Sequence, residues 1–294
     1  MVRFTKMEGL GNDYIFIDNF AERLPEEEFP VLARAVSDRH FGVGADGLIV
    51  ILPPTEPGFD LRFRMFNADG SEGEMCGNGM RSFARLAFER GLVRKTRIRV
   101  QTLAGPVVPE IVLDEAGRVQ GVRVDMGPPR LRSTEIPLTG PERGPVLAET
   151  VEAAGESFTF AAVSMGNPHI VIFTDADLDR IDLAHVGPAL EHHPLFPQRT
   201  NVHFVRPEGP GELRMRTWER GSGITLACGT GACAALVAAS LTGRSGRTAD
   251  VHLPGGTLRV EWAEDGHVYQ TGPANEVCRG EFTRDWRREA AARS

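Results

Sequence analysis

The chain has 294 residues, of which 41% are hydrophobic and 25% charged, a composition typical of soluble globular proteins. This length is comfortable for two domains of about 140 residues each. The net charge of -7 and the lack of Lys/Arg clusters interleaved with aromatic residues argue against a nucleic-acid partner, and the most apolar run, Leu226–Leu241, is too short and too rich in small residues to predict a membrane span.

The first residues, Met1–Tyr14, carry no apolar leader or cleavage pattern, so we expect a cytoplasmic protein. Two strands are predicted within Phe4–Asn19, because hydrophobic residues run on both sides of a Gly-Leu-Gly-Asn turn. Apolar residues at helical spacing predict a helix over Pro25–Arg39, and a glycine loop then leads into a strand at Leu48–Leu52.

The next segment, Leu61–Ala87, predicts a strand, a glycine-rich turn and a helix. The alternation in LRFRMF indicates the strand, and MRSFARLAF gives the helix one apolar face. We expect this helix to begin just after Cys76 and to end at Gly91, which suits a C-terminal glycine cap.

Short strands follow up to the middle of the chain. We expect them at Ile98–Gln101, Gly105–Leu113 and Gly121–Asp125, with a hairpin turn over Asp114–Gly117. The sequence Gly-Pro-Pro at 127–129 then breaks the pattern, and we interpret it as the crossover between domains.

The second half repeats this type of organisation. A strand at Phe158–Val163 leads into SMGNPHIVIF, a helix is predicted over Asp182–His192, and the strand of RTNVHFV follows. Further strands are predicted within Thr248–Gly272. The tail, Asp285–Ser294, is at best a charged helix.

An internal repeat connects the two halves. The segment Leu213–Ala239 aligns without a gap to Leu61–Ala87, and each segment places a cysteine 15 residues after a Leu-Arg-x-Arg opening, followed by Gly-x-Gly. A Gly-Asn pair before a hydrophobic strand also occurs once in each half, at Asn12 and at Asn167. We therefore predict two similar halves related by a pseudo-twofold axis, residues 1–125 with 276–294 returning to them, and residues 126–275.

The repeated cysteines, Cys76 and Cys228, are the strongest candidates for chemistry. Each lies at a predicted helix N-terminus, where unpaired N–H groups favour an anion and are expected to lower the pKa of a thiol. The adjacent glycines allow a carboxylate to approach the same N–H groups. The other two cysteines, Cys233 and Cys278, are more simply interpreted as core residues, and no spacing suggests a disulfide framework or a metal site.

Three further residues have the character of a ligand-binding cleft. Glu219 and Arg220 replace the Asn67 and Ala68 of the first half in an otherwise apolar strand-to-turn segment, which favours a substrate contact over a surface ion pair. His169 follows the second Gly-Asn pair, where an imidazole could tune or orient a thiol.

The motifs KMEGLGNDY, HFGVGADGL, MFNADGSEGEMCGNGMRS, SMGNPH, RTNV and ERGSGITLACGTGA together resemble those of the diaminopimelate epimerase family, over nearly the whole chain. Proline racemases share the two-cysteine logic but not all of these motifs, and phenazine-biosynthesis-like relatives lack the cysteine pair. The resemblance implies an α/β (α+β) fold of two pseudo-symmetric halves, each a mixed or antiparallel sheet wrapped around a central helix, with the active site in the cleft between them.

The resemblance also implies roles for individual residues. Cys76 and Cys228 would be the acid/base thiols, with His169 and Glu219 tuning their pKa values. Substrate would be bound by the side chains of Asn12, Asn67, Asn167, Asn201, Glu219 and Arg220 and by the N–H groups of Gly77, Asn78, Gly229 and Thr230. The chain departs from the common pattern at Gly47, Ile224 and Ser82, which bears on substrate contacts more than on the reaction.

The implied reaction is the cofactor-independent, metal-independent interconversion of LL- and meso-diaminopimelate in lysine and peptidoglycan precursor synthesis. Racemisation of another polar amino acid by the same cysteine pair stays open, as does, from a different class, a thiol redox protein. The absence of a CxxC motif argues against the redox protein, and a non-catalytic amino-acid-binding module would not need two thiols. The resemblance leaves the oligomeric state undecided, with a homodimer as one option.

Overall fold

The computed structural model describes residues 1–287 and divides the chain into two compact units. The first unit is Met1–Val124 together with the chain from Gly272 onward, and the second is Asp125–Thr271. Most of the helix that the sequence suggested for Asp285–Ser294, and the end of the returning segment 276–294, lie outside the described residues.

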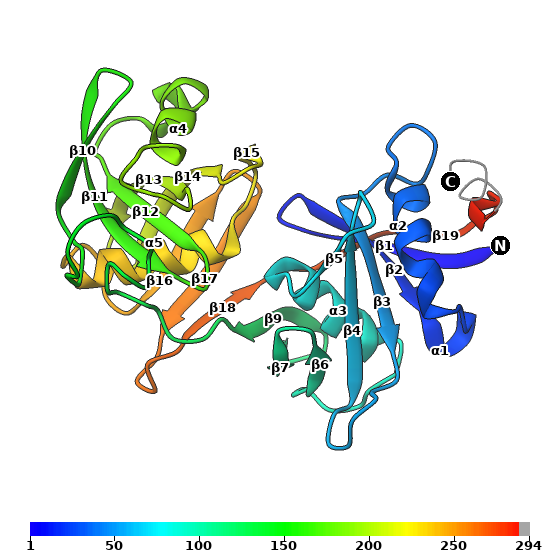
Figure 1. The fold of residues 1–294 in the computed structure, drawn as a ribbon. Helices are drawn as coiled ribbons and strands as arrows, with labels where there is room; N and C mark the ends of the chain where they lie inside the picture. Colours follow the sequence, from blue (N-terminus) through cyan, green and yellow to red (C-terminus); the bar gives the residue numbers. More distant parts are fainter. Residues whose placement is uncertain (288–294) are drawn as a thin grey trace. The chain divides into compact units, whose positions relative to one another are not determined.

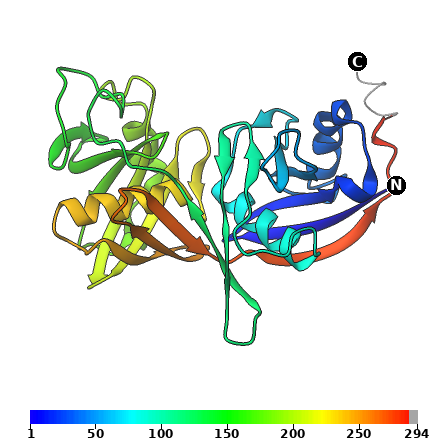
Figure 2. The same cartoon turned by 90° about the horizontal axis from the view of Figure 1, so that it is seen from below.

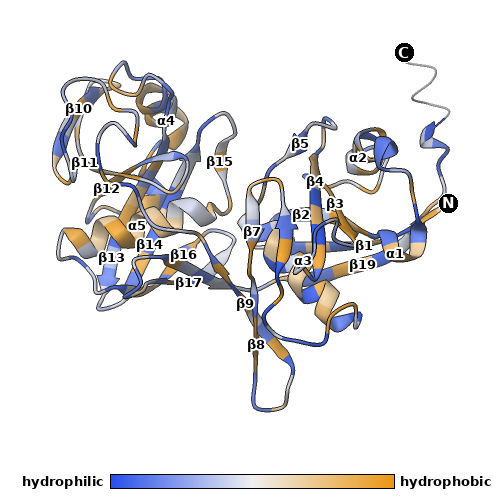
Figure 3. Cartoon of the chain, turned by 60° about the horizontal axis from the view of Figure 1, so that its bottom comes forward, coloured by the Kyte–Doolittle hydropathy of each residue, from blue (hydrophilic) through white to orange (hydrophobic). Residues whose placement is uncertain are grey.

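The first unit contains a mixed sheet (Figure 1). Its order is β19 (Asn275–Phe282), β1 (Val2–Gly9), β2 (Asn12–Asp18), β3 (Gly47–Leu52), β4 (Leu61–Asn67), β6 (Val100–Thr102) and β7 (Gly105–Val107), with β5 (Glu72–Gly73) beside β4. The helices of this unit are α1 (Asn19–Glu22), the 3-10 turn η1 (Glu26–Glu28), α2 (Phe29–Ser37) and α3 (Gly77–Glu89). β3 is fully buried, and Figure 3 shows it as hydrophobic along its length.

The second unit contains a larger mixed sheet. Its strands follow in the order β10 (Glu149–Ala153), β11 (Glu156–Ser164), β12 (Pro168–Phe173), β13 (Asn201–Gly209), β14 (Glu212–Glu219), β16 (Thr248–Leu253), β17 (Gly256–Trp262) and β18 (Val268–Gly272), with β15 (Gly223–Thr225) beside β14. The helical segments are η2 (Leu178–Arg180), α4 (Leu183–Glu191) and α5 (Gly229–Leu241). β9 (Val119–Asp125) and β8 (Glu110–Leu113) follow β18 in the strand order and form an antiparallel hairpin with each other.

The two units share one topology. From β1 to β7 successive strand pairs are antiparallel, parallel, antiparallel, parallel and antiparallel, and the same alternation runs from β11 to β17. α2 and α4 occupy equivalent crossovers, as do α3 and α5. The duplication therefore extends well beyond the two cysteine segments from which it was predicted.

The central helices are positioned by burial. Residues Gly231–Ala239 of α5 are buried on every side, as expected of a helix that is apolar all round, and the helix contacts β11, β12 and β17 (gold in Figure 2). α3 contacts β1, β2 and β3 and ends where predicted, since Gly91 adopts a left-handed φ of 70° after the last turn.

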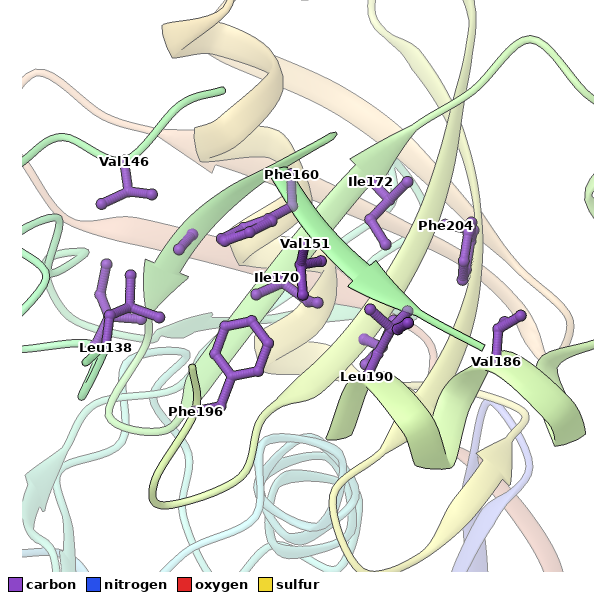
Figure 4. Packing of buried hydrophobic residues seen from close by; sticks show 14 of the residues in the cluster. Leu138, Val146, Val151, Phe160, Ile170, Ile172, Val186, Leu190, Phe196 and Phe204 are labelled. Carbon is purple, nitrogen blue, oxygen red and sulfur yellow. The ribbon is translucent and has the colours of Figure 1, made fainter. Parts of the chain in front are cut away.

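One core in each unit lies between the sheet and the first crossover helix, α2 or α4. In the second unit, Val186 and Leu190 of α4 pack against strand residues, and Phe160 meets Phe196 edge to face with ring centroids 5.7 Å apart (Figure 4). In the first unit, Phe29 of α2 meets Phe66 of β4 in the same way at 5.8 Å. This packing fixes the strands that carry the candidate site residues.

Some sequence predictions need correction. The single strand expected over Gly105–Leu113 is two strands, because Pro109 lacks the N–H that would continue the ladder. Cys233 is buried as expected, but Cys278 is exposed, since β19 is an edge strand. The hairpin turn at Asp114–Gly117 is confirmed.

Among the described residues, the longest apolar helices fall short of what crossing a bilayer would require.

Candidate active site

Each unit places a cysteine at the start of its central helix. Cys76 caps α3 with φ −135° and ψ 125°, and Cys228 caps α5 with φ −128° and ψ 104°. In both, a strand and a short hairpin strand lead into the cysteine, as the repeated sequence predicts. The two units therefore build the surroundings of their cysteines alike.

The helix starts offer N–H groups to an anion. The Cys76 carbonyl accepts from Met80 at 2.8 Å and the Cys228 carbonyl from Ala232 at 2.9 Å, so intrahelical bonding begins only at the fourth residue after each cysteine. The earlier N–H groups have no acceptor within the helix and carry the positive end of its dipole. They include those of Gly77 and Asn78 in α3 and of Gly229 and Thr230 in α5.

Cys76 is surrounded by polar groups of the first unit. Its Sγ accepts from the Gly79 N–H at 3.5 Å and lies 3.6 Å from Oδ1 of Asn12, to which a thiol can donate. Nδ2 of Asn12 donates to Asp46 at 2.7 Å, which turns Oδ1 towards the sulfur. Tyr14 is buried beside the same thiol, and burial together with the charge at Cys76 raises the pKa of its phenol.

The other two asparagines predicted for the first unit have protein partners. Asn67 is exposed at the end of β4, and its amide donates to Oγ of Ser71 at 2.9 Å. Asn78 is buried, and its Oδ1 accepts from the buried Arg81 at 2.7 Å. The side chain of Asn78 therefore holds the helix start, while its backbone N–H belongs to the anion-binding end.

Cys228 has a less polar environment than expected. Only 5% of the residue is exposed, and Glu219 lies beside it with Oε1 held by the Thr225 hydroxyl at 2.6 Å. Burial, and then the negative charge of Glu219, raise the pKa of the Cys228 thiol. The expectation that a helix N-terminus lowers the pKa is therefore wrong for Cys228, because burial outweighs the dipole. Burial also raises the pKa of the Glu219 carboxyl.

His169 belongs to a buried hydrogen-bonded network. Its Nε2 lies 2.8 Å from Oδ1 of Asn167, and its Nδ1 lies 2.8 Å from Nε2 of His203. His203 in turn contacts the Thr217 hydroxyl through Nδ1 at 2.9 Å. Both imidazoles are fully buried, which depresses the pKa of His169 well below its usual value and lowers the pKa of His203 to about 3. His169 thus acts as a neutral imidazole here.

The remaining predicted residues of this unit gather around the same helix start. Nδ2 of Asn167 donates to Oγ1 of Thr230 at 3.4 Å, and that hydroxyl lies 3.7 Å from the Cys228 sulfur. Asn201 is buried, donates to the Pro168 carbonyl at 2.8 Å and accepts from the Arg220 N–H at 3.0 Å. Asn201 therefore braces the loops that carry its neighbours.

The three departures from the family pattern have different consequences. A side chain at Gly47 would meet the Phe66 carbonyl at 2.2 Å and the Tyr14 ring at 3.0 Å, so only glycine fits. Ile224 is exposed on β15, and Ser82 is buried within α3. Only Ile224 presents a new side chain to the surface.

Tyr14, His203 and Thr217 were not predicted, although the repeat contained a signal for them. Tyr14 lies two residues after Asn12, as His169 lies two residues after Asn167. In the sheets, His203 pairs with Thr217 where the first unit pairs Ile49 with Met65. Aligning whole strands, rather than only the cysteine segments, would have revealed this polar substitution.

Ligand-type atoms of His169, His203 and Cys228 all lie within 4.8 Å of one another, a cluster that no sequence spacing indicated. Its members come from β12, β13 and the cap of α5. The hydrogen bond between the two imidazoles occupies the nitrogens that would otherwise face an ion, so this structure presents the cluster as a hydrogen-bonded network.

Comparison with known proteins gives consistent results. A family model described as diaminopimelate epimerase matches residues 4–132 and 161–277. The chain is 54% identical over 281 residues to a diaminopimelate epimerase of Pelotomaculum thermopropionicum, covering 96% of this chain and 99% of that protein. It is 53% identical over 285 residues to one of Moorella thermoacetica, covering 97% and 100%.

The fold is also similar to that of a solved structure. A Bacillus anthracis phenazine biosynthesis protein of the PhzF family superposes with a TM-score of 0.66 at 18% identity, over 95% of this chain and 98% of the other. At this identity the likeness concerns the fold alone, in which two similar halves each enclose a central helix.

Proposed function

The chain belongs to the diaminopimelate epimerase family, and we propose that it interconverts LL- and meso-diaminopimelate without a cofactor, in lysine and peptidoglycan precursor synthesis. The observation that carries this proposal is the repeated placement of a cysteine at a helix start, once in each unit. The four cysteines lack the spacing of a disulfide framework, which suits the reducing cytoplasm, where we propose that the protein works. A homodimer is our proposal for its assembly.

Inversion at the α-carbon begins with the removal of a very weakly acidic proton. A thiolate in water is far too weak a base for this, so the site must stabilise the negative charge that develops on the carboxylate side. The N–H groups of Gly77 and Asn78, and those of Gly229 and Thr230, supply fixed dipoles for that purpose. Neither helix has to reorganise when the charge appears.

We assign the proton transfers to Cys76 and Cys228. One cysteine, as thiolate, takes the α-proton from one face of the carbon, and the other, as thiol, donates a proton to the opposite face. The atoms balance, because the enzyme ends with the proton on the first sulfur and none on the second. The reverse reaction uses the same groups with exchanged roles.

Glu219 and His169 would tune Cys228. The Glu219 carboxylate favours the protonated thiol, which suits a proton donor. The Thr230 hydroxyl, oriented through Asn167 and His169, offers a hydrogen bond to the sulfur after the proton has left. The first half-site has no carboxylate at the position of Glu219, where Asn67 stands instead.

Arg220 and the asparagines Asn12, Asn67, Asn167 and Asn201 would bind the polar groups of the substrate. Nη1 of Arg220 donates to the Gln198 carbonyl at 3.0 Å, and this hydrogen bond holds the guanidinium in place. The other N–H groups of the guanidinium make up the rest of its planar fork. A fork of this kind recognises a carboxylate through two parallel hydrogen bonds. This favours a diacid substrate such as diaminopimelate.

The test is incubation of the purified, reduced protein with LL-diaminopimelate, without added cofactor, followed by chiral analysis. We expect the meso isomer to accumulate to an equilibrium mixture. If no meso isomer forms while the protein is folded and its thiols are reduced, the substrate assignment is wrong.

A further inference from the structure

A network of buried and half-buried polar side chains connects the core of the second unit to Cys228. It starts at Thr217, passes through His203, His169 and Asn167, and reaches Thr230, with successive contacts of 2.9, 2.8, 2.8 and 3.4 Å. The Thr230 hydroxyl then lies 3.7 Å from the Cys228 sulfur. His203 and Thr217, at the far end, have no role in the proposed reaction so far.

Each hydrogen bond of this network has a defined donor and acceptor. Oδ1 of Asn167 can only accept, so Nε2 of His169 must carry its hydrogen. A neutral imidazole has one N–H, which leaves Nδ1 of His169 to accept from Nε2 of His203. By the same reasoning, Nδ1 of His203 accepts from the Thr217 hydroxyl.

The direction continues to the sulfur. Nδ2 of Asn167 donates to Oγ1 of Thr230, so the hydrogen of that hydroxyl stays available for Cys228. If His169 carried its hydrogen on Nδ1 instead, the bare Nε2 would accept from the Asn167 amide. The amide oxygen would then turn towards Thr230 and attract its hydrogen away from the sulfur.

Both imidazoles stay neutral because of their surroundings. His169 and His203 are fully buried, and the charged group that faces His169 is Arg220, which further disfavours an imidazolium. Cys228 faces Glu219 and Cys233, which oppose formation of a thiolate. A hydrogen bond from Thr230 has the opposite effect, because it stabilises the thiolate form of Cys228.

The first unit shows that the fold does not require this network of polar side chains. The equivalents of His203 and Thr217 there are Ile49 and Met65, which pair with each other in the same register and are buried. Buried polar groups are costly unless every one is hydrogen-bonded. The presence of His203 and Thr217 in the second unit alone therefore indicates a role other than folding.

We propose that His203 is a positioning residue for Cys228: by donating from Nε2 it holds His169 in the tautomer that keeps the Asn167 amide and the Thr230 hydroxyl directed towards the sulfur. The role of Cys228 in proton transfer rests on the proposed function. The effect of His203 on the Cys228 thiol does not rest on that function, because it concerns hydrogen bonding in the free protein. Cys76 and Cys228 occupy equivalent positions, but only Cys228 should depend on this network for its hydrogen bonding.

The test compares His203→Ile, which installs the residue found in the first unit, with His203→Gln, whose amide can still bond to Nδ1 of His169. His252→Ile, on β16 of the same unit, is the matched control. Alkylation of Cys228 by iodoacetamide is followed by mass spectrometry at several pH values, and Cys76 in the same samples reports on folding. The tautomer of His169 is determined by long-range proton–nitrogen NMR.

We expect His203→Ile to slow alkylation of Cys228 by up to about tenfold at a fixed pH, because losing a hydrogen bond to a charged sulfur corresponds to about one pKa unit. His169 should change from the Nε2–H tautomer to a mixture. His203→Gln should restore most of the rate, and Cys76 and the control should be unchanged.

An unchanged Cys228 rate or a pure Nε2–H tautomer in His203→Ile would overturn the proposal, and so would an equal loss of rate in His203→Gln. These readings do not depend on turnover of diaminopimelate. If the wild-type protein fails to epimerise this substrate, the proposed function fails while the inference about the thiol is still decided by alkylation.

Discussion

Cys76 and Cys228 cap equivalent helices but have different neighbours. Cys76 contacts Asn12 and the phenol of Tyr14, whereas Cys228 lies beside Glu219 and a hydroxyl linked to two neutral histidines. A carboxylate next to a buried thiol favours the protonated form, so Glu219 helps to keep Cys228 a thiol in the free protein. The internal repeat gives both cysteines the same position at a helix start, and the different residues around them make the two thiols chemically unlike.

Replacing either cysteine by alanine tests the assignment of the thiols. We expect Cys76→Ala and Cys228→Ala to lower kcat by about a thousandfold or more, because each removes an acid or base that the other cannot replace. The fold should survive with a small loss of packing. Steady-state assays and circular dichroism measure both effects, with the exposed Cys278→Ala as the control. Full activity in either site variant would exclude the two-base mechanism.

Arg220→Lys tests the recognition of the carboxylate. Lysine keeps the charge but lacks the planar fork, so kcat/KM should fall by about tenfold to a hundredfold. Arg206→Lys is the control, because Arg206 pairs with Glu208 through a largely surface ion pair. Equal kcat/KM values for wild type and Arg220→Lys would place Arg220 outside the substrate-binding site.

The strand–hairpin–helix element was predictable because its signals are local. Alternating apolar residues, glycines and a helical apolar face give β4, β5 and α3, and again β14, β15 and α5. The polar network was not predictable in the same way, because His169, His203 and Thr217 lie on three different strands. Their proximity depends on strand register, and the raised pKa of Cys228 depends on burial by the whole unit.

Glycine at position 47 is predicted to be essential to the β2–β3–β4 element. An added Cβ would meet the backbone carbonyl of Phe66 at 2.2 Å, which a strand in the middle of a sheet cannot relieve. We expect Gly47→Ala to lower the free energy of unfolding by about 1–3 kcal/mol. Gly246→Ala, where the added Cβ meets nothing within 4 Å, should be nearly neutral. Urea unfolding of both variants makes the comparison, and similar midpoints would contradict the steric argument.

The whole chain should lose stability in mild acid because of its two buried histidines. The pKa values of His169 and His203 are depressed in the folded protein, the latter to about 3, so the unfolded chain binds more protons below about pH 6.5. Stability is therefore present above that pH and falls as the pH is lowered towards 3, by about 1 kcal/mol per pH unit for each histidine.

Thermal unfolding between pH 7.5 and 4.5 measures this dependence. His203→Gln should reduce the slope, since it removes one of the two groups, while His252→Ile, at a half-buried position of the same unit, leaves both of them in place. A slope that is the same in wild type and His203→Gln would show that His203 does not resist protonation in the folded state.

The most direct test of the two-base mechanism is the fate of the α-proton in deuterated water, followed by NMR early in the reaction. If Cys76 and Cys228 each serve one face, the donating thiol has already exchanged with solvent, so the product should carry deuterium at the inverted centre. Recovered substrate should stay largely protiated, because its own proton leaves on the other sulfur. Early product that retains its protium would show a single base acting on both faces and would contradict the two-base mechanism.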